Sequence, residues 1–143
     1  MKTSLFDIAA SCLIANEIEE KLLLTQQATQ AWRNKLLSLE SHEPMRLINQ
    51  PGQPAKLVVV KPSDVPRRRL GNKVGLIALI HAIAHIEFNA INLAWDAIHR
   101  FRGLPDSFYD DWVTVASEEA YHFQLLRKRL KELDHDYGDL PAH

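Results

Sequence analysis

The chain has 143 residues, 46% hydrophobic and 24% charged, which is the composition of one globular domain. Its formal net charge of −1 gives no whole-chain indication of a nucleic acid or another anionic ligand. The single cysteine, Cys12, excludes an internal disulfide and fits a reducing compartment. No targeting pattern and no run of eighteen uninterrupted apolar residues occurs. We therefore predict a soluble cytoplasmic protein without membrane association.

The first predicted element is one long helix from about Ser4 to Leu39, within an N-terminal segment 1–41. Ser4 and Asp7 have the spacing of a capping box. Apolar residues then recur at helical spacing among polar ones: Ile18, Leu22, Trp32, Leu36 and Leu39. Pro44 ends this pattern, because the residue before a proline avoids the helical conformation.

A proline-rich connector is predicted over residues 42–71. It holds five of the seven prolines, at positions 44, 51, 54, 62 and 66. The apolar run 57–60 fits a short extended piece, but the prolines around it disfavour a sheet. We expect this connector to lie in extended form across a helical bundle.

Residues 72–137 are predicted to form an antiparallel helical hairpin. Capping and breaking residues predict the helix boundaries. The first hairpin helix runs from near Asn72 to Arg102, and the second begins at Asp106 or Ser107 and ends at Tyr137-Gly138. Only a few residues around Gly103 and Pro105 join them, so the two helices must be antiparallel. The chain as a whole is thus predicted to be a single all-α domain, 1–143, with three long helices.

Ionisable side chains interrupt the apolar stripe of each hairpin helix. The stripes are Ile80, Ala84, Glu87, Ile91, Ala94 and Ile98 on one helix, and Trp112, Val115, Glu119, His122, Leu126 and Leu133 on the other. A carboxylate on a core face is costly unless it is paired, hydrogen-bonded or bound to a metal. Glu87, Glu119 and His122 therefore need a common explanation.

These three residues are also expected at the same level of the hairpin. Glu87 lies 17 residues before Leu104, near the centre of the turn, and Glu119 and His122 lie 15 and 18 residues after it. At about 1.5 Å per residue, all three are roughly 25 Å from the turn. The i, i+3 spacing of Glu119 and His122 points both side chains the same way.

Carboxylates with one imidazole suit iron or manganese, and the absence of thiolates from the group disfavours a structural zinc site. Di-iron bundles of the ferritin-like type use a glutamate from each of two helices and a Glu-x-x-His from each of two others. The hairpin stripes supply half of that set. We predict Glu87, Glu119 and His122 as metal ligands, with Glu119 bridging two ions and the others holding one each. A buried Glu–His pair without metal is the alternative.

Other residues give weaker indications of function. His81 and His85 are an i, i+4 pair, a spacing that can bind zinc, but the sequence between them lacks the glutamate of the zinc motif His-Glu-x-x-His. We therefore favour a structural role, in which both histidines pack or hydrogen-bond against the first helix or the connector. The run 67–69 is Arg-Arg-Arg and is a candidate phosphate contact. Because no aromatic residues are interleaved with these arginines, we favour a salt-bridged or solvated stretch. Trp95 and Trp112 are expected in the core.

Several longer segments resemble an uncharacterised bacterial ferritin-like family known as domain of unknown function 455. They are Val65-Pro-Arg-Arg-Arg-Leu70, the stretch from His81 to Glu87 with Asn89-Ala-Ile91, Phe108-Tyr-Asp-Asp-Trp112, Glu118-Glu-Ala-Tyr-His122 and the ending Tyr137-Gly-Asp-Leu-Pro-Ala-His143. The similarity covers about residues 50–143. It implies an incomplete four-helix di-metal bundle, kinship with tRNA-hydroxylating non-haem di-iron monooxygenases, and metal ligands at Glu87, Glu119 and His122.

The resemblance also implies what would complete the half-site. Family members are roughly twice as long and continue into a second helical pair that supplies the other glutamate and Glu-x-x-His. The present chain is then either a truncated product or one half of a homodimer. The implied function is an iron-dependent (or manganese-dependent) oxidase or hydroxylase, dinuclear when completed, with an unknown substrate. The alternatives are a non-catalytic helical interaction protein or a metal-free fragment. A further alternative is tRNA modification, which is suggested by the kinship and by the arginines 67–69.

Overall fold

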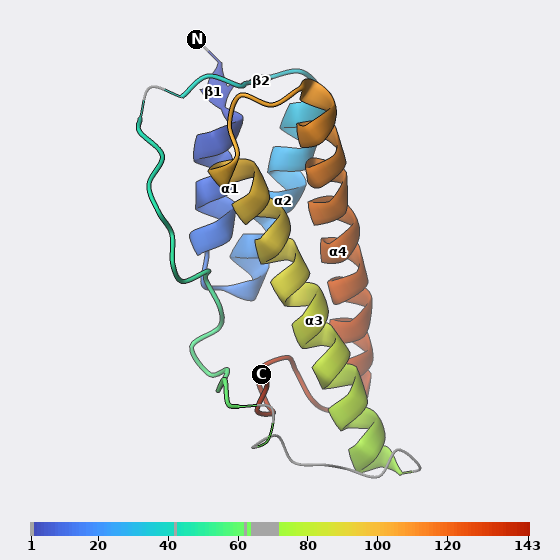
Figure 1. Cartoon of the computed structure of the whole chain (residues 1–143). Coiled ribbons are helices and arrows are strands. Elements are labelled where there is room, and N and C mark those ends of the chain that lie inside the picture. Colours follow the sequence, from blue (N-terminus) through green and yellow to red (C-terminus); the bar gives the residue numbers. More distant parts are fainter. Residues whose placement is uncertain (1, 42, 62, 64–71) are drawn as a thin grey trace.

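The computed structural model describes residues 2–41, 43–61, 63 and 72–143. Its elements in chain order are β1 (Thr3–Ser4), α1 (Leu5–Ile14), α2 (Ile18–Arg33), β2 (Leu37–Ser38), α3 (Lys73–Arg100) and α4 (Asp106–Glu132). The described part is mostly helical, which confirms the predicted all-α class, and its four helices form a bundle (Figure 1).

Two helices, α1 and α2, stand where one long helix was predicted. Helix α1 ends before Ala15, whose backbone is extended (φ −59°, ψ 124°). The Lys21 ammonium explains the break, because its Nζ donates to the carbonyl oxygens of Cys12 at 2.7 Å and Leu13 at 2.9 Å. These carbonyls at the end of α1 thus bond the Lys21 side chain and, for Leu13, also the Gly52 amide at 2.8 Å, instead of the amides of a continuing helix. The chain reverses, and α2 runs back beside α1 (Figure 1).

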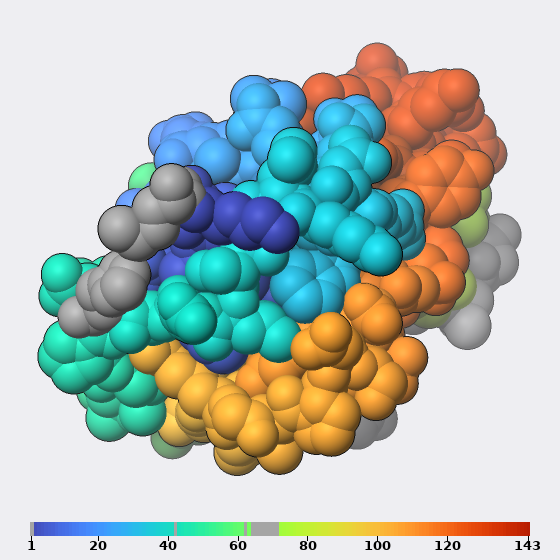
Figure 2. Space-filling model, turned by 90° about the horizontal axis from the view of Figure 1, so that it is seen from above, coloured from blue at the N-terminus to red at the C-terminus, as the bar shows by residue number. Residues whose placement is uncertain are grey.

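Short backbone pairings hold the non-helical segments. Strands β1 and β2 are parallel, with Thr3 opposite Leu37. Residues 43–61 of the connector follow one side of the bundle (Figure 1), and in the view along the bundle they pack beside α1, away from α4 (Figure 2). The extended piece predicted at 57–60 forms a single bridge, in which the Val60 amide donates to the Ala142 carbonyl at 2.7 Å. Pro62, Pro66 and the arginines 67–69 lie outside the described residues.

The predicted hairpin corresponds to α3 and α4. Asn72 caps α3, as expected, by accepting a hydrogen bond from the Gly75 amide at 2.8 Å. The Tyr109 hydroxyl fixes the turn, because it donates to the Phe101 carbonyl at 2.9 Å and accepts from the Leu104 amide at 3.3 Å. Both hairpin helices pack on the α1–α2 pair through a core whose largest fully buried members include Leu5, Leu13, Ile91, Trp95 and Phe123.

Helix α4 ends at Glu132, five residues before the predicted stop at Tyr137. Asp134 adopts a left-handed conformation (φ 62°), which turns the chain back toward α3. Arg127 then holds the returning segment through two hydrogen bonds to the Asp136 carboxylate, at 2.9 and 3.1 Å. The segment brings Tyr137 into the core, where its ring is fully buried against Phe88. Trp95 is fully buried as predicted, whereas Trp112 is only partly buried.

Candidate metal centre

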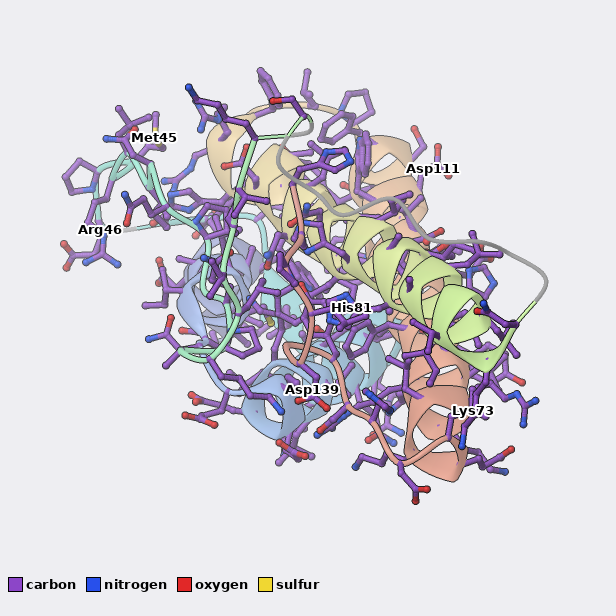
Figure 3. All side chains as sticks on the ribbon, turned by 90° about the horizontal axis from the view of Figure 1, so that it is seen from below. Met45, Arg46, Lys73, His81, Asp111 and Asp139 are labelled. Carbon is purple, nitrogen blue, oxygen red and sulfur yellow. The ribbon has the colours of Figure 1, made fainter. Side chains whose placement is uncertain are left out.

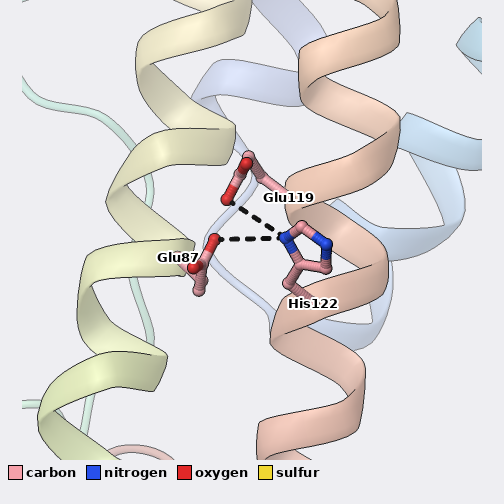
Figure 4. A group of neighbouring side chains, drawn as sticks. All are labelled: Glu87, Glu119 and His122. Atoms are coloured by element: carbon pink, nitrogen blue, oxygen red, sulfur yellow. Dashed lines mark ion pairs between the residues drawn. The ribbon is translucent and has the colours of Figure 1, made fainter.

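The three residues predicted as metal ligands meet on the seam between α3 and α4 (Figure 4). The His122 Nδ1 lies 3.9 Å from Glu87 Oε2 and 3.7 Å from Glu119 Oε2. One ligand atom from each side chain lies within 4.8 Å of the others. The expected level and direction of the three groups are therefore found in the fold, while metal binding by them stays a prediction.

Each helix brings its ligand to the seam by ordinary apolar packing. The residues that share the α3 stripe with Glu87 are all buried: Ile80, Ala84, Ile91, Ala94 and Ile98. On α4, the one-turn spacing places Glu119 and His122 on the edge of the buried face. The Glu87 and Glu119 side chains are 20% and 23% exposed, and that of His122 is 49% exposed. The centre is thus half-buried and open on the His122 side.

One carboxylate oxygen at this centre lacks a partner. Glu87 Oε2 is buried and has no hydrogen-bond partner within the described part of the chain. The distances from His122 Nδ1 to Glu87 Oε2 and to Glu119 Oε2 both exceed the range of about 2.7–3.2 Å for a hydrogen bond. A metal-free, hydrogen-bonded Glu–His pair is therefore not formed here, and an unpaired buried acceptor costs about 1–3 kcal/mol or more.

A cation among the three groups would satisfy this oxygen. In the described ranges, neither carboxylate has an ion pair with a lysine or arginine, so the only nearby group able to carry a positive charge is the imidazole. Two carboxylates and a neutral imidazole are donors that suit iron or manganese. The donor set, the spacing of the ligand atoms and the orphaned oxygen all fit a metal ion of this kind.

A second Glu-x-x-His spacing, Glu132 to His135, was not among the predicted ligands. Helix α4 ends at Glu132, so the two side chains do not share a helical face. The Glu132 carboxylate instead pairs with Arg129 at 3.0 Å, and His135 Nδ1 lies 2.9 Å from the Leu133 carbonyl oxygen. This second spacing lies apart from the metal centre.

His81 and His85 are both buried and hydrogen-bonded, as favoured from the sequence, but their partners belong to the C-terminal segment and not to the first helix or the connector. His81 Nε2 accepts from the amides of Gly138 at 2.9 Å and Leu140 at 3.4 Å. For His85, Nδ1 lies 2.7 Å from the Tyr137 hydroxyl and Nε2 lies 2.9 Å from the carbonyl oxygen of the last residue. Figure 3, which looks at the bundle from below, shows His81 near Asp139 of this segment.

The electrostatic environment of His81 agrees with a structural role. Burial, with a smaller effect from neighbouring His85, lowers the pKa of His81 to about 4. The ring is therefore neutral near pH 7, and its Nε2 keeps the lone pair that accepts from the two backbone amides. Since protein groups already use these ring nitrogens, the pair is poorly suited to a metal ion.

Lys21 is an important buried residue that the sequence reasoning did not identify. Besides the α1 carbonyls, its Nζ donates to Asn92 Oδ1 on α3 at 2.7 Å, so one ammonium joins three helices. Burial lowers its pKa to about 8. Its position between Ile18 and Thr25 on the inward face of α2 was the available signal.

These features define a helical-bundle protein with a carboxylate–histidine cluster on the seam of its long hairpin. The family described as "Protein of unknown function (DUF455)" matches residues 14–143, and the chain belongs to this family. It is 40% identical over 142 residues to an uncharacterized protein of Haemophilus influenzae (strain Rd), an alignment that covers 92% of this chain and 46% of that relative. The chain thus spans about half the length of the curated relative it matches. No solved structure matches it significantly.

Proposed function

We propose that this chain carries half of a ferritin-like di-metal carboxylate site, and that the completed site oxidises or hydroxylates a substrate. The observation that carries the proposal is the buried Glu87 Oε2, which lacks a hydrogen-bond partner in the described structure and faces Glu119 and His122. The ligand types and their helical spacing match one half of the set used in di-iron bundles. A purely structural role would leave this oxygen only the 3.9 Å ion-pair contact with His122, which requires a protonated imidazole.

The residues at the seam have distinct proposed roles. In this proposal Glu119 would bridge two ions, and Glu87 and His122 would each hold one. Iron bound here would supply redox chemistry with O₂, and manganese is the alternative that the same donors accept. Phe88 and Phe123, the next residues along each helix, are fully buried with ring centroids 5.3 Å apart, so they exclude water from the inner side of the seam. A small molecule would therefore approach from the side of His122.

Metal analysis of the purified full chain tests this function. After chelation and dialysis, the wild-type protein is reconstituted with Mn(II), or with Fe(II) under anaerobic conditions, and bound metal is measured. We expect retained metal in the wild type and its loss in Glu119→Ala. The exposed neighbour Glu118 provides the matched control, because Glu118→Ala removes a carboxylate outside the cluster. Metal at background in the wild type, or equal retention by both variants, would contradict the proposal.

A non-catalytic interaction protein is the second candidate, and the exposed apolar residues of α3 favour it. It predicts partner binding that does not change with Glu119→Ala. Modification of tRNA rests on kinship and on the arginines 67–69, which lie outside the described residues. Salt-sensitive binding of tRNA would support this third function.

A further inference from the structure

Three aromatic rings meet in the core next to the metal centre. Phe88 follows Glu87 on α3, and Phe123 follows His122 on α4. The third ring, Tyr137, comes from the C-terminal segment. The ring centroids are 5.3 Å apart for the two phenylalanines, and those of Tyr137 and each phenylalanine are 5.1 and 5.2 Å apart. All three rings are fully buried, and we call them the ring triangle.

The ring triangle is a closed set of contacts, because each ring touches the other two. The rings of Phe123 and Tyr137 are nearly perpendicular, at 88°, and the Phe88 ring is tilted by 57° and 35° from these two. Edge-to-face geometry is favourable for aromatic pairs. Since protein interiors are close-packed, a change in one of these rings displaces its neighbours.

Polar contacts on α3 fix the position of Tyr137. His85 Nε2 lies 2.9 Å from the backbone oxygen of His143, which can only accept, so Nε2 carries the proton. The other ring nitrogen, Nδ1, therefore accepts from the Tyr137 hydroxyl at 2.7 Å. The Tyr137 ring also stacks on His81, whose Nε2 accepts from the amide of Gly138 at 2.9 Å. The C-terminal segment thus holds the ring at one place and in one orientation.

The ring triangle contributes to the spacing of α3 and α4 at the level of the metal centre. The distance between two packed helices depends on the side chains at their contact. Here those side chains include Phe88 and Phe123, each next to a candidate ligand, and Tyr137 packs against both. The candidate ligand atoms lie within 4.8 Å of one another. Because metal–ligand distances vary by only about 0.2 Å, a small change in helix spacing matters for binding.

We propose that Tyr137 is a positioning residue for the metal centre. Through the ring triangle, it holds the candidate ligands of α3 and α4 at the separation that a metal ion requires. This inference rests on the proposed metal function and deepens it. It concerns the ligands that α3 and α4 supply, whatever other ligands complete the site. The alternative is a purely structural Tyr137, whose loss weakens metal binding no more than an equally destabilising change elsewhere in the core.

The Kd of the full chain for Mn(II), measured by equilibrium dialysis of variants with native helix content, tests this role. Tyr137→Leu removes the ring and should raise the Kd roughly 10–100-fold, the usual range when a residue that supports metal ligands is changed. Phe123→Leu removes the α4 ring of the triangle and should act in the same way, so the test does not depend on the folding of one variant. Tyr137→Phe keeps all three rings and should bind Mn(II) like the wild type.

Leu5→Ala is the matched control for lost stability. Leu5 is fully buried at the start of α1, near the end of the bundle that holds the hairpin turn (Figure 1). Its truncation removes a large core side chain far along the bundle from the ring triangle. We therefore expect a less stable protein with an unchanged Kd, measured at a temperature where every variant is folded.

The low-temperature electron paramagnetic resonance spectrum of bound Mn(II) gives a second readout, because it depends on how the ligands are arranged around the ion. At saturating Mn(II), the spectrum should change in Tyr137→Leu. It should stay as in the wild type in Tyr137→Phe and Leu5→Ala. A residue that contributes only to stability would not alter this spectrum.

The outcomes separate this inference from the proposed function. Wild-type affinity and spectrum in Tyr137→Leu and Phe123→Leu overturn the positioning role and leave the metal function intact. Equal weakening by Leu5→Ala also overturns it, since general stability would then be the cause. Weakening by Tyr137→Phe as large as by Tyr137→Leu overturns the role of the ring, because the hydroxyl would then be responsible. Metal at background in the wild type overturns both the inference and the metal function.

Discussion

Helix α3 contributes to two clusters of ionisable side chains, one on its inner face and one on its seam with α4, and the two clusters differ in how their polar atoms are satisfied. On the inner face, His81 Nε2 and both ring nitrogens of His85 lie within 3.4 Å of a partner. On the seam, the contacts of His122 with Glu87 and Glu119 are 3.9 and 3.7 Å. The inner cluster is hydrogen-bonded, and the seam cluster is not.

This difference separates a structural cluster from one suited to a ligand. Buried polar groups in folded proteins almost always have partners, so a buried oxygen without one needs an explanation. From the sequence, the i, i+4 histidine pair already gave a weaker indication of a metal site than Glu87 did, because it lacks the glutamate of the zinc motif. Contact geometry agrees with that order, because the C-terminal segment already satisfies the histidines.

The largest effect is expected from Tyr137, which holds the C-terminal segment over the inner cluster. Its fully buried ring stacks on His81, with centroids 5.3 Å apart, and packs against Phe123 at 5.2 Å. Tyr137→Ala should lower the free energy of unfolding by about 3–5 kcal/mol, as for other large buried aromatic residues. Tyr137→Phe keeps the ring and removes the hydroxyl near His85, so it should cost about 1 kcal/mol. Urea denaturation measures both, and equal costs would contradict this role.

Metal should stabilise the seam cluster by a smaller amount. At free Mn(II) 100 times its Kd, the free energy of unfolding should rise by about 2.7 kcal/mol. Glu87→Gln should remove this gain. Without metal, the same variant should be at least as stable as the wild type, because it removes a buried carboxylate oxygen that has no partner in the described structure. Thermal denaturation with Mn(II) or chelator tests both statements; equal stabilisation of the two proteins would place the metal elsewhere.

Acid should weaken the inner cluster through His81. Burial lowers the pKa of His81 to about 4 in the folded chain, against an ordinary value near 6.5. The unfolded chain then binds more protons between these values, so this contribution is fully present above about pH 6.5 and is lost as pH falls toward 4. The charged or titratable groups that influence the His81 ring are His85, Asp136, Asp139 and Lys56.

From pH 7 to pH 5, the loss due to His81 should be roughly 2 kcal/mol, at 1.36 kcal/mol per pKa unit. His81→Gln keeps a hydrogen-bond acceptor but cannot take up the proton. Urea midpoints at the two pH values measure the effect. The same pH dependence in wild type and variant would show that other groups cause it.

The smallest effect is expected at the solvent edge of the C-terminal segment. Lys56 and Asp139 form an ion pair at 2.9 Å, with side chains 51% and 35% exposed. Exposed pairs of this kind contribute about 0.2–1 kcal/mol. Lys56→Met keeps most of the side-chain stem and should cost no more than that. The cost should shrink further in 1 M salt, which screens exposed charges; a larger, salt-independent loss would indicate that packing of the stem matters instead.

The sequence by itself determined the helical hairpin and the meeting of Glu87, Glu119 and His122 on its seam. The signals for the hairpin are local: helical periodicity, the cap at Asn72 and the helix-breaking residues near Gly103. The short turn then fixes which residues of one helix lie at the same height as which residues of the other. Glu87 and Glu119 could therefore be placed side by side by counting from the turn. The family also followed from the sequence, which matches it over residues 14–143.

Only the tertiary structure decided the break between α1 and α2 and the role of the histidine pair. Lys21 contacts Asn92 across 71 positions of the chain, and His85 contacts Tyr137 across 52. Helical periodicity carries no information about such distant hydrogen bonds, since they depend on how whole helices pack. The unpaired Glu87 oxygen was also a tertiary result, because residue spacing gives the direction of a side chain but not whether a partner lies within hydrogen-bond distance.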